Sequence, residues 1–355
     1  MKTRNNSLLQ DELLVSVIIS TYNRCDALVE TLHALGRQTV PPDRYEVIVV
    51  DDGSSDDTFE VASGITLPCD LRVFRHEQNR GVSAGRNLAM SHARGKYLIL
   101  VSDDLIVPEN FIATHLDTLE RYPGFWVVGG LEQLPSLRET SFGRYLDDWE
   151  QHLDELRKHK PLEPGIWEMA APTARNLSLP REDYLKVGPF DEQFRTTCED
   201  QDWAHRATEF GIKFLYNTHI TCLHNDQAGD LLRQCRFQER GAHDTVLLCF
   251  KYPGHRSAPI VRVNGYLSMG DSPSLTLKKL IKLLMATSPM TRLAEMVIAL
   301  AETRRVADPL LWRLYRALIG LYIFRGWRRG LRTLREREGD DALLALMRDR
   351  KIQHA

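Results

Sequence analysis

Short apolar runs alternate with amphipathic segments through the first half of the chain. Residues 15–20 (VSVIIS) and 45–50 (YEVIVV) are rich in β-branched side chains and typical of strands buried on both faces. Between them, Leu28, Leu32 and Leu35 recur at helical spacing and predict a helix with one buried stripe. Further strands are predicted at residues 71–76, 96–101 and 125–130. Such strands separated by helices predict an α/β fold with a mostly parallel sheet flanked by helices.

The later segments of this half are less uniform. Helices are predicted at residues 83–95 and 108–121, and irregular structure at 131–160. Another helix is predicted at residues 199–211, before a short strand at 213–216.

Beyond residue 226 the pattern changes to helical periodicity without strand-like runs. We therefore expect an α/β domain over residues 1–226 and an α-helical region over residues 227–355. Apolar side chains recur at helical spacing in this region: Leu277, Leu280, Ile281, Leu284, Leu293, Met296, Val297 and Leu300. A chain of 355 residues agrees with a prior of about two domains.

A basic amphipathic segment lies near the end of the chain. An apolar face that includes Leu311, Leu318 and Tyr322 is followed by a cluster of arginines between Arg325 and Arg337. Such a C-terminal basic helix can lie on an anionic membrane. The alternative is a helix that packs on the catalytic domain or on a second subunit, with its basic flank in solvent.

Composition narrows the classes of function. The formal net charge is -2, so no overall basic field is present to bind nucleic acid. The first apolar run, at residues 15–19, is too short to span a bilayer. Six scattered cysteines include no CxxC pair. We expect a reduced, cytoplasmic protein without a zinc site. A peripheral location at the inner face of the membrane is compatible with the basic C-terminal segment.

Polar clusters follow three of the predicted strands. Ser20–Asn23 follow the first strand, Asp51–Ser54 the second, and Asp103 and Asp104 the fourth. The carboxyl ends of parallel strands meet at one edge of a sheet, where ligands bind. Two adjacent carboxylates repel each other and resist burial, but a hard divalent cation would offset this repulsion. The alternative is a solvated pair of aspartates that caps the next helix.

Five motifs in order carry a resemblance: VSVIISTYNR, VIVVDDGSSDDT, NRGVSAGRN, YLILVSDDLIVPENF and FDEQFRTTCEDQDWAHRATEFG. Over roughly residues 13–226 the chain resembles family-2 glycosyltransferases, which have the Rossmann-like GT-A fold. The resemblance implies a nucleoside-diphosphate sugar donor of the UDP, GDP or dTDP type and an acceptor hydroxyl on a glycan, a lipid-linked glycan or a secondary metabolite. It also implies inversion by direct displacement.

The resemblance implies a donor site built on the strand ends. Asp103 would contact the ribose, and Asp104 with His224 would hold Mg²⁺ or Mn²⁺. The first position of the family's Asp-x-Asp motif is Ser102 here, which is a departure. The other residues expected at the nucleotide are Ser20, Thr21, Tyr22, Arg24, Asp51, Asp52, Arg80, Arg86 and Asn87. For Asp51 and Asp52, an ordinary strand-to-helix turn is the alternative.

The resemblance also implies that the Glu-Asp element of the fifth motif, Glu199 and Asp200, lies on the acceptor side of the sugar. Asp200 would be the catalytic base, with Glu199 in a supporting role. The alternative is a capping box over residues 197–200 at a helix start, where the helix dipole would lower the pKa of Asp200 and a nearby diphosphate would raise it. Asn176 and Trp203 are the acceptor-binding candidates, although core packing is the alternative for Trp203.

Two other classes of protein share part of this pattern. A catalytically inactive nucleotide-sugar-binding or assembly protein would keep the nucleotide site without base chemistry at Asp200. A sugar nucleotidyltransferase needs a loop rich in Gly, Lys and Arg after the first strand, and residues 20–30 supply none. An oligomer is compatible with the sequence, and polysaccharide biosynthesis is the expected setting.

Overall fold

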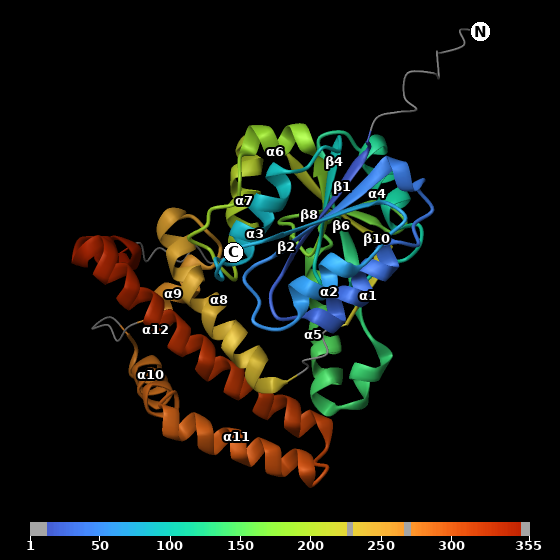
Figure 1. The fold of residues 1–355 in the computed structure, drawn as a ribbon. Helices are drawn as coiled ribbons and strands as arrows, with labels where there is room; N and C mark the ends of the chain where they lie inside the picture. Colours follow the sequence, from blue (N-terminus) through green and yellow to red (C-terminus); the bar gives the residue numbers. More distant parts are fainter. Residues whose placement is uncertain (1–12, 226–229, 266–270, 349–355) are drawn as a thin grey trace. The chain divides into compact units, whose positions relative to one another are not determined.

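The computed structural model describes residues 13–225, 230–265 and 271–348 (Figure 1). The chain divides into two units. The first comprises Met1–Ser136 and Asp147–Gln227, and the second comprises Leu137–Leu146 and Ala228–Ala355. The predicted change of domain after residue 226 falls at residues 226–229, which lie outside the described residues.

The first half of the sheet is parallel. Its order is β3-β2-β1-β4. These strands are β1 (Val15–Thr21), β2 (Tyr45–Asp51), β3 (Asp70–Arg75) and β4 (Tyr97–Val101). The register pairs Val17 with Val47 on β2 and with Ile99 on β4, so the carboxyl ends of the three strands lie side by side.

The second half of the sheet is mixed. β9 (Asn176–Pro180) is antiparallel to both β4 and β6 (Phe125–Gln133). β10 (Lys213–His224) is parallel to β6 and antiparallel to β5 (Leu105–Ile106) and β8 (Ile166–Met169), and β7 (Lys160–Glu163) closes the edge. The predicted α/β class is confirmed, with the parallel pairing concentrated in the first strands.

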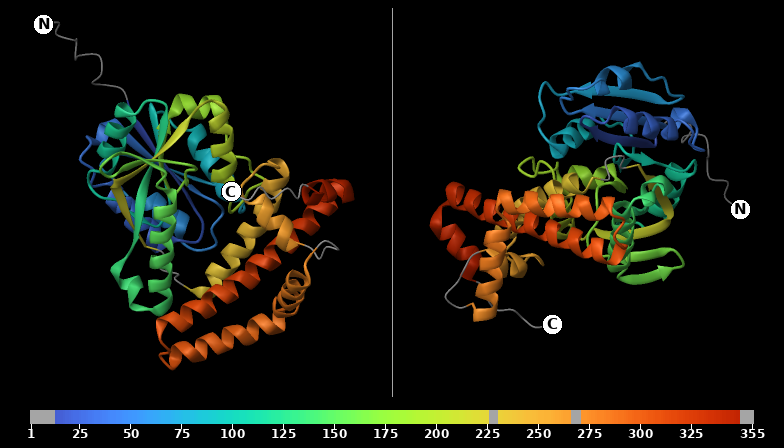
Figure 2. Two further views of the ribbon diagram at one scale, coloured as in Figure 1. Left: turned by 180° about the vertical axis from the view of Figure 1, so that it is seen from behind. Right: turned by 90° about the horizontal axis from the view of Figure 1, so that it is seen from below.

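Alternation along β1 separates two hydrophobic cores. Val15, Val17 and Ile19 face one core and Ile18 faces the other. Helices α1 (Cys25–Leu35), α2 (Thr58–Gly64) and α4 (Phe111–Arg121) contribute to the first core. Helices α3 (Val82–Ser91), α6 (Arg181–Val187) and α7 (Glu199–Glu209) contribute to the second. Figure 2 shows helices on both faces of the sheet.

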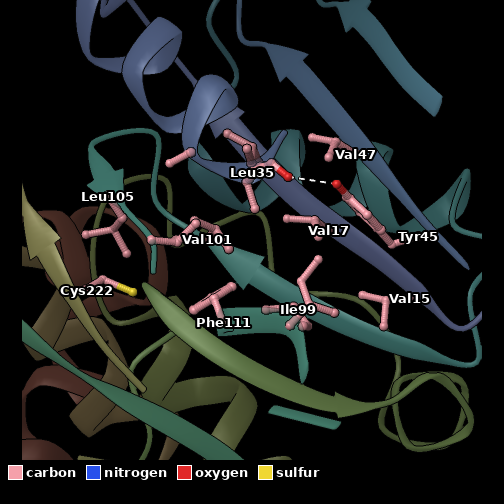
Figure 3. Close-up of a cluster of buried hydrophobic side chains, with 14 of the residues drawn as sticks. Val15, Val17, Leu35, Tyr45, Val47, Ile99, Val101, Leu105, Phe111 and Cys222 are labelled. Atoms are coloured by element: carbon pink, nitrogen blue, oxygen red, sulfur yellow. Dashed lines mark hydrogen bonds between the residues drawn. The ribbon is translucent and has the colours of Figure 1, made fainter. Parts of the chain in front are cut away.

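A hydrogen bond ties α1 to β2 in the first core. The Tyr45 hydroxyl donates to the Leu35 carbonyl oxygen at 2.8 Å (Figure 3). This bond satisfies the only polar atom of a ring that is 1% exposed, so the ring can pack among Val17 and Val47.

Several elements differ from their predicted bounds. The strand predicted at 213–216 runs on to residue 224, and α3 ends at Ser91, before Gly95. Gly95 instead lies against β1, where a Cβ atom would be 2.5 Å from the Ser16 backbone nitrogen. The segment 131–160, predicted to be irregular, contains the helix α5 (Ser141–Arg157). Short 3₁₀ turns occur at η1 (Pro42–Arg44) and η2 (Pro135–Glu139).

The second unit is helical, as predicted. Its helices are α8 (Leu231–Lys251), α9 (Ala258–Gly265), α10 (Pro273–Met285), α11 (Ser288–Thr303) and α12 (Asp308–Arg348). α8 and α12 approach closely at two glycines of α12: a Cβ atom at Gly326 would be 2.2 Å from the Glu239 carbonyl oxygen, and one at Gly330 2.7 Å from that of His243.

The apolar face of α12 is covered within the second unit. Leu311, Tyr315, Leu318 and Tyr322 are buried in one cluster with Phe142 of α5, and Leu331 and Leu334 are buried in another. This finding favours the alternative in which the C-terminal basic helix packs within the protein, because its apolar face is already occupied. Membrane contact through this helix stays a prediction.

A buried histidine links α4 to β9 in the first unit. His115 is 0% exposed, its Nε2 lies 2.9 Å from Asn176 Oδ1 and its Nδ1 lies 2.7 Å from Ser178 Oγ. The carbonyl oxygen of Asn176 can only accept, so Nε2 carries the proton and the Ser178 hydroxyl donates to Nδ1. Burial lowers the pKa of His115 to about 4, so the ring is neutral in the folded protein.

This histidine predicts a loss of stability in acid. The unfolded chain protonates His115 near its ordinary pKa of about 6.5, whereas the folded chain does not. Below pH 6.5 the site should therefore cost about 1 kcal/mol of unfolding free energy per pH unit. His115→Gln removes this contribution, so urea unfolding at pH 7, 6 and 5 should show the stability advantage of the unsubstituted protein shrinking as the pH falls. A difference that stays constant with pH would contradict this.

Candidate functional site

The ends of β1, β2 and β4 bring three predicted groups together. The Thr21 hydroxyl donates to Asp103 Oδ2 at 2.7 Å, across from β1 to the end of β4. The Asp52 backbone N–H donates to the Thr21 carbonyl oxygen at 2.9 Å, from the end of β2. The predicted convergence of these strand ends is therefore present in the structure.

Asp51 and Asp52 order the loops that follow the strands. Asp51 is 0% exposed and accepts a hydrogen bond from the Ser54 backbone N–H at 3.1 Å. Asp52 is 2% exposed and accepts from the backbone N–H groups of Arg80 at 3.0 Å and Gly81 at 2.6 Å. Both carboxylates thus have a turn-forming role, and contact with a nucleotide base stays a prediction.

The positively charged side chain of Arg24 lies beside Asp103 and Asp104. Arg24 Nη1 pairs with Asp104 Oδ2 and lies 3.8 Å from Asp103 Oδ1. We predicted Arg24 beside the base, whereas in the structure it lies at the carboxylates. Its charge offsets part of the repulsion between two side chains that are only 13% and 7% exposed.

The pKa values of Asp103 and Asp104 are shifted in opposite directions. Burial and the negative charge of Asp104 raise the pKa of Asp103 to about 6. Burial also opposes ionisation of Asp104, but the hydrogen bond from His224 and the charges of Arg24 and Arg175 outweigh it and lower the pKa of Asp104. At neutral pH Asp104 is the firmly ionised member of the pair.

His224 ends β10 beside Asp104. Its Nε2 lies 3.3 Å from Asp104 Oδ2, and the Gln133 amide on β6 lies 3.1 Å from its Nδ1. With the amide donating to Nδ1, the Nε2 atom is the one that faces the carboxylate. The two predicted metal ligands therefore point at one another, and Gln133, which the sequence did not single out, orients the ring.

Arg175 is the central residue that the sequence did not reveal. Its Nη2 donates to Glu150 Oε1 at 2.7 Å, and its positive charge acts on both Asp104 and Asp200. Its neighbour Asn176, predicted to bind the acceptor, begins β9 and is 1% exposed, with its amide bonded to the Ile220 carbonyl oxygen at 3.0 Å. The acceptor-binding prediction for Asn176 is not supported. Arg175 belongs to the turn before β9, and its side chain, unlike that of Asn176, acts on the carboxylates of the site.

The first turn of α7 carries the predicted base. Cys198 is the residue before the helix, with φ of 67°, and its own side chain does not cap the helix. The capping-box alternative, which involves Thr197, stays a prediction. Glu199 is 7% exposed and accepts from Arg86 at 2.8 Å. Burial and the charge of Glu199 raise the pKa of Asp200 to about 7, against the opposing charges of Arg86 and Arg175. The lowering expected from the helix dipole is outweighed.

Other predicted residues lie elsewhere in the first unit. The Asn87 amide bonds the Phe190 backbone, and Arg80 pairs with Glu192 at 2.9 Å on the surface. Trp203 is 1% exposed and packs on Trp126, so its acceptor-binding prediction is not supported and core packing is its role.

Two residues at the end of β1 complete the predicted set. Tyr22 is 45% exposed, and the Ser20 side chain lies against Gly85 of α3, where a Cβ atom would be 2.1 Å from Ser20 Oγ. The exposed ring of Tyr22 is free to meet a ligand, whereas Ser20 serves helix packing.

The site fits a divalent cation that shares its ligands with a substrate. Among the residues that the structure describes, Asp104 Oδ1 is a buried carboxylate oxygen with no hydrogen-bond partner. No group of three or more His, Cys, Asp or Glu side chains within those residues is arranged to hold a metal alone. Mg²⁺ characteristically takes one or two carboxylates and completes its shell with water and phosphate oxygens.

Comparison with known proteins assigns the family. Residues 16–155 match the model described as Glycosyl transferase family 2. The chain is 25% identical over 294 residues to "Uncharacterized glycosyltransferase YfnE" of Bacillus subtilis (strain 168), covering 69% of this chain and 72% of that protein. It is 26% identical over 218 residues to "Glucosyl-dolichyl phosphate glucuronosyltransferase" of Haloferax volcanii, covering 60% and 67%. Residues 16–155 thus match glycosyl transferase family 2, and the resemblance is confirmed.

A solved structure confirms the fold. The mannosyltransferase PcManGT from Pyrobaculum calidifontis, solved in complex with GDP-Man and Mn²⁺, superposes with a TM-score of 0.57 at 18% identity. The match covers 90% of this chain and 88% of that one. The predicted GT-A fold with a helical C-terminal region is therefore confirmed.

Proposed function

We propose that the first unit transfers a sugar from a nucleoside-diphosphate donor to an acceptor hydroxyl, with inversion at the anomeric carbon. The observation that carries this proposal is the convergence of Asp103, Asp104 and His224 at the strand ends, beside Arg175, whose charge acts on both Asp104 and Asp200. The pKa of Asp200, raised to about 7 by burial and by Glu199, agrees with it. A carboxylate with a pKa near neutrality suits a general base. Membership of the family supports a transferase.

The donor side would use the residues around the acidic pair. Asp103 would accept hydrogen bonds from the ribose, and Arg175 and Arg24 would offset the negative charge of the departing diphosphate. Asp104 and His224 would hold Mg²⁺ or Mn²⁺, which when bound supplies further positive charge at the diphosphate. The Mn²⁺ in the PcManGT complex supports this choice of ion.

The acceptor side would use α7. Asp200, held beside Glu199 and Arg86, would take the proton of the acceptor hydroxyl as its oxygen attacks the anomeric carbon from the face opposite the diphosphate. A lipid-linked glycan is one acceptor class, in line with the name of the Haloferax relative, and a free glycan and a secondary metabolite are the others. We propose the cytoplasm as the compartment.

The base assignment predicts a loss of transfer with retained donor binding. The donor is first selected by a thermal-shift screen of UDP-, GDP- and dTDP-sugars with Mn²⁺. Asp200→Asn should then slow acceptor-dependent release of the nucleoside diphosphate by roughly 100-fold or more, because the proton acceptor is lost. Donor affinity by calorimetry should stay within about twofold, since Asp200 lies on the acceptor side in this account.

The matched control for this variant is Glu209→Gln, at the exposed far end of the same helix, which should leave the rate unchanged. In the unsubstituted protein the rate should rise with pH through about 7 and then level off, because Asp200 acts only when ionised. Full activity of Asp200→Asn would refute the role of this residue.

The metal assignment predicts that Mn²⁺ stops strengthening nucleotide binding when Asp104 is neutralised. Asp104→Asn keeps the size of the side chain and removes its charge, so calorimetry should show the Mn²⁺-dependent gain in nucleotide affinity falling by roughly tenfold or more. Asp117→Asn, a carboxylate 65% exposed on α4, serves as the control. An unchanged gain in the Asp104 variant would rule out its metal role.

A further inference from the structure

Helices α10 and α11 of the second unit carry an apolar surface that no other described residue of that unit covers. Its members are 48–69% exposed: Leu277, Leu280, Ile281 and Leu284 on α10, and Leu293, Met296, Val297 and Leu300 on α11. We call this set the α10–α11 apolar surface. Contiguous exposed apolar side chains of this number mark an interaction site.

The exposed apolar side chains on both helices form a regular pattern rather than a few scattered positions. The four exposed side chains on each helix follow the spacing i, i+3, i+4, i+7, which is one continuous helical face. On α11 a different face packs inward, because Ile298 is 3% exposed and lies in a cluster with Leu311 and Tyr315 of α12. Figure 1 shows α11 beside α12. The helix therefore has one apolar face for its own unit and a second for a partner.

Charge indicates the nature of that partner. Residues 273–306 contain two acidic side chains, Glu295 and Glu302, and six basic ones: Lys278, Lys279, Lys282, Arg292, Arg304 and Arg305. Lys279 is buried and pairs with Asp271 at 2.7 Å, so it does not add to the charge of the surface. The segment is positive in a chain whose net charge is -2.

The two acidic side chains are engaged with α12. Glu295 accepts from the Tyr322 hydroxyl and Glu302 from the Tyr315 hydroxyl, each at 2.6 Å. Both glutamates thus face α12, whereas Lys278 and Arg292 are exposed and adjoin Leu277 and Leu293 in sequence. An apolar face flanked by exposed positive charge suits an anionic surface that also accepts apolar side chains.

We propose that the α10–α11 apolar surface binds an anionic lipid bilayer, with its leucines below the headgroups and its basic residues among them. Among the described helices none is long and apolar enough to span a membrane alone; α10 and α11 reach that length and composition only together, and they meet at an 80° bend. Helices with this combination of faces lie in the plane of the interface. A two-fold contact with a second copy is disfavoured, because it would set the positive surface against itself.

The proposal goes beyond glycosyl transfer and does not rest on it. The test is sedimentation of the full chain with vesicles of phosphatidylcholine alone, or of equal parts phosphatidylcholine and phosphatidylglycerol. The unsubstituted protein should sediment with the anionic vesicles and much less with the neutral ones, and added salt should weaken binding. Failure to bind the anionic vesicles would overturn the proposal.

Two variants separate the apolar and the charged contributions. The fourfold variant Leu280→Gln, Leu284→Gln, Met296→Gln and Leu300→Gln changes only exposed side chains and should weaken vesicle binding by roughly tenfold or more. The double variant Lys278→Glu and Arg292→Glu should weaken binding to anionic vesicles by roughly tenfold or more and leave the weak binding to neutral vesicles unchanged.

The matched control carries Leu156→Gln and Leu185→Gln, two leucines of the first unit that are 65% and 64% exposed, and should bind as the unsubstituted protein does. Thermal unfolding checks that each variant is folded. Undiminished vesicle binding by the fourfold variant would overturn the proposal. So would sedimentation velocity showing a dimer that this variant dissociates, with no vesicle binding, because the occupant would then be a second copy of the chain.

Discussion

The site depends on arginines that make buried carboxylates tolerable at one edge of the sheet. Asp103 and Asp104 follow one buried strand, and neither could be ionised there without a positive neighbour. Arg24 lies on this pair, and Arg175 extends the same compensation to Asp200. The positive charges stabilise the ionised form of these carboxylates to different extents. The pKa of Asp104 is lowered, which suits the proposed metal ligand, while the pKa of Asp200 is raised to about 7, which suits the proposed base.

Distant parts of the chain supply this balance. Arg175 is held by Glu150 of α5, and Arg86 of α3 pairs with Glu199 of α7. Each ion pair joins segments that the sheet brings together, so the charges at the site are fixed by the fold rather than by local sequence. The proposed separation of a donor side and an acceptor side follows from this arrangement.

Sequence patterns predicted the parts of the fold that depend on local periodicity. The strands β1, β2 and β4 and the polar residues at their ends could be read from apolar runs and the residues that stop them. Glu150 was out of reach because α5 is rich in polar residues and resembles a loop. Arg175 was missed in favour of Asn176, because choosing between them requires knowing that Asn176 faces His115 of α4 while Arg175, in the turn before β9, pairs with Glu150 of α5.

In the second unit, too, local sequence predicts the helices but not how their faces are packed. Periodic apolar residues occur on α10, α11 and α12 alike, yet the stripe on α12 is buried and the one on α10 is exposed. Periodicity reveals that a helix has an apolar face, but only the packing of the whole unit decides whether that face is used internally. The basic residues near the chain end drew attention to α12, whereas the uncovered apolar side chains belong to the two helices before it.

Titration of the Asp200 carboxyl by carbon-detected NMR tests the central claim most directly, with Asp200→Asn identifying its signal. The account predicts a pKa near 7 in the unsubstituted protein and a higher one in Arg175→Met, because a positive charge that favours the ionised carboxyl is removed. Glu150 keeps Arg157 as a partner in that variant, at 3.3 Å. An ordinary aspartate pKa of about 4, unmoved by loss of Arg175, would contradict the account.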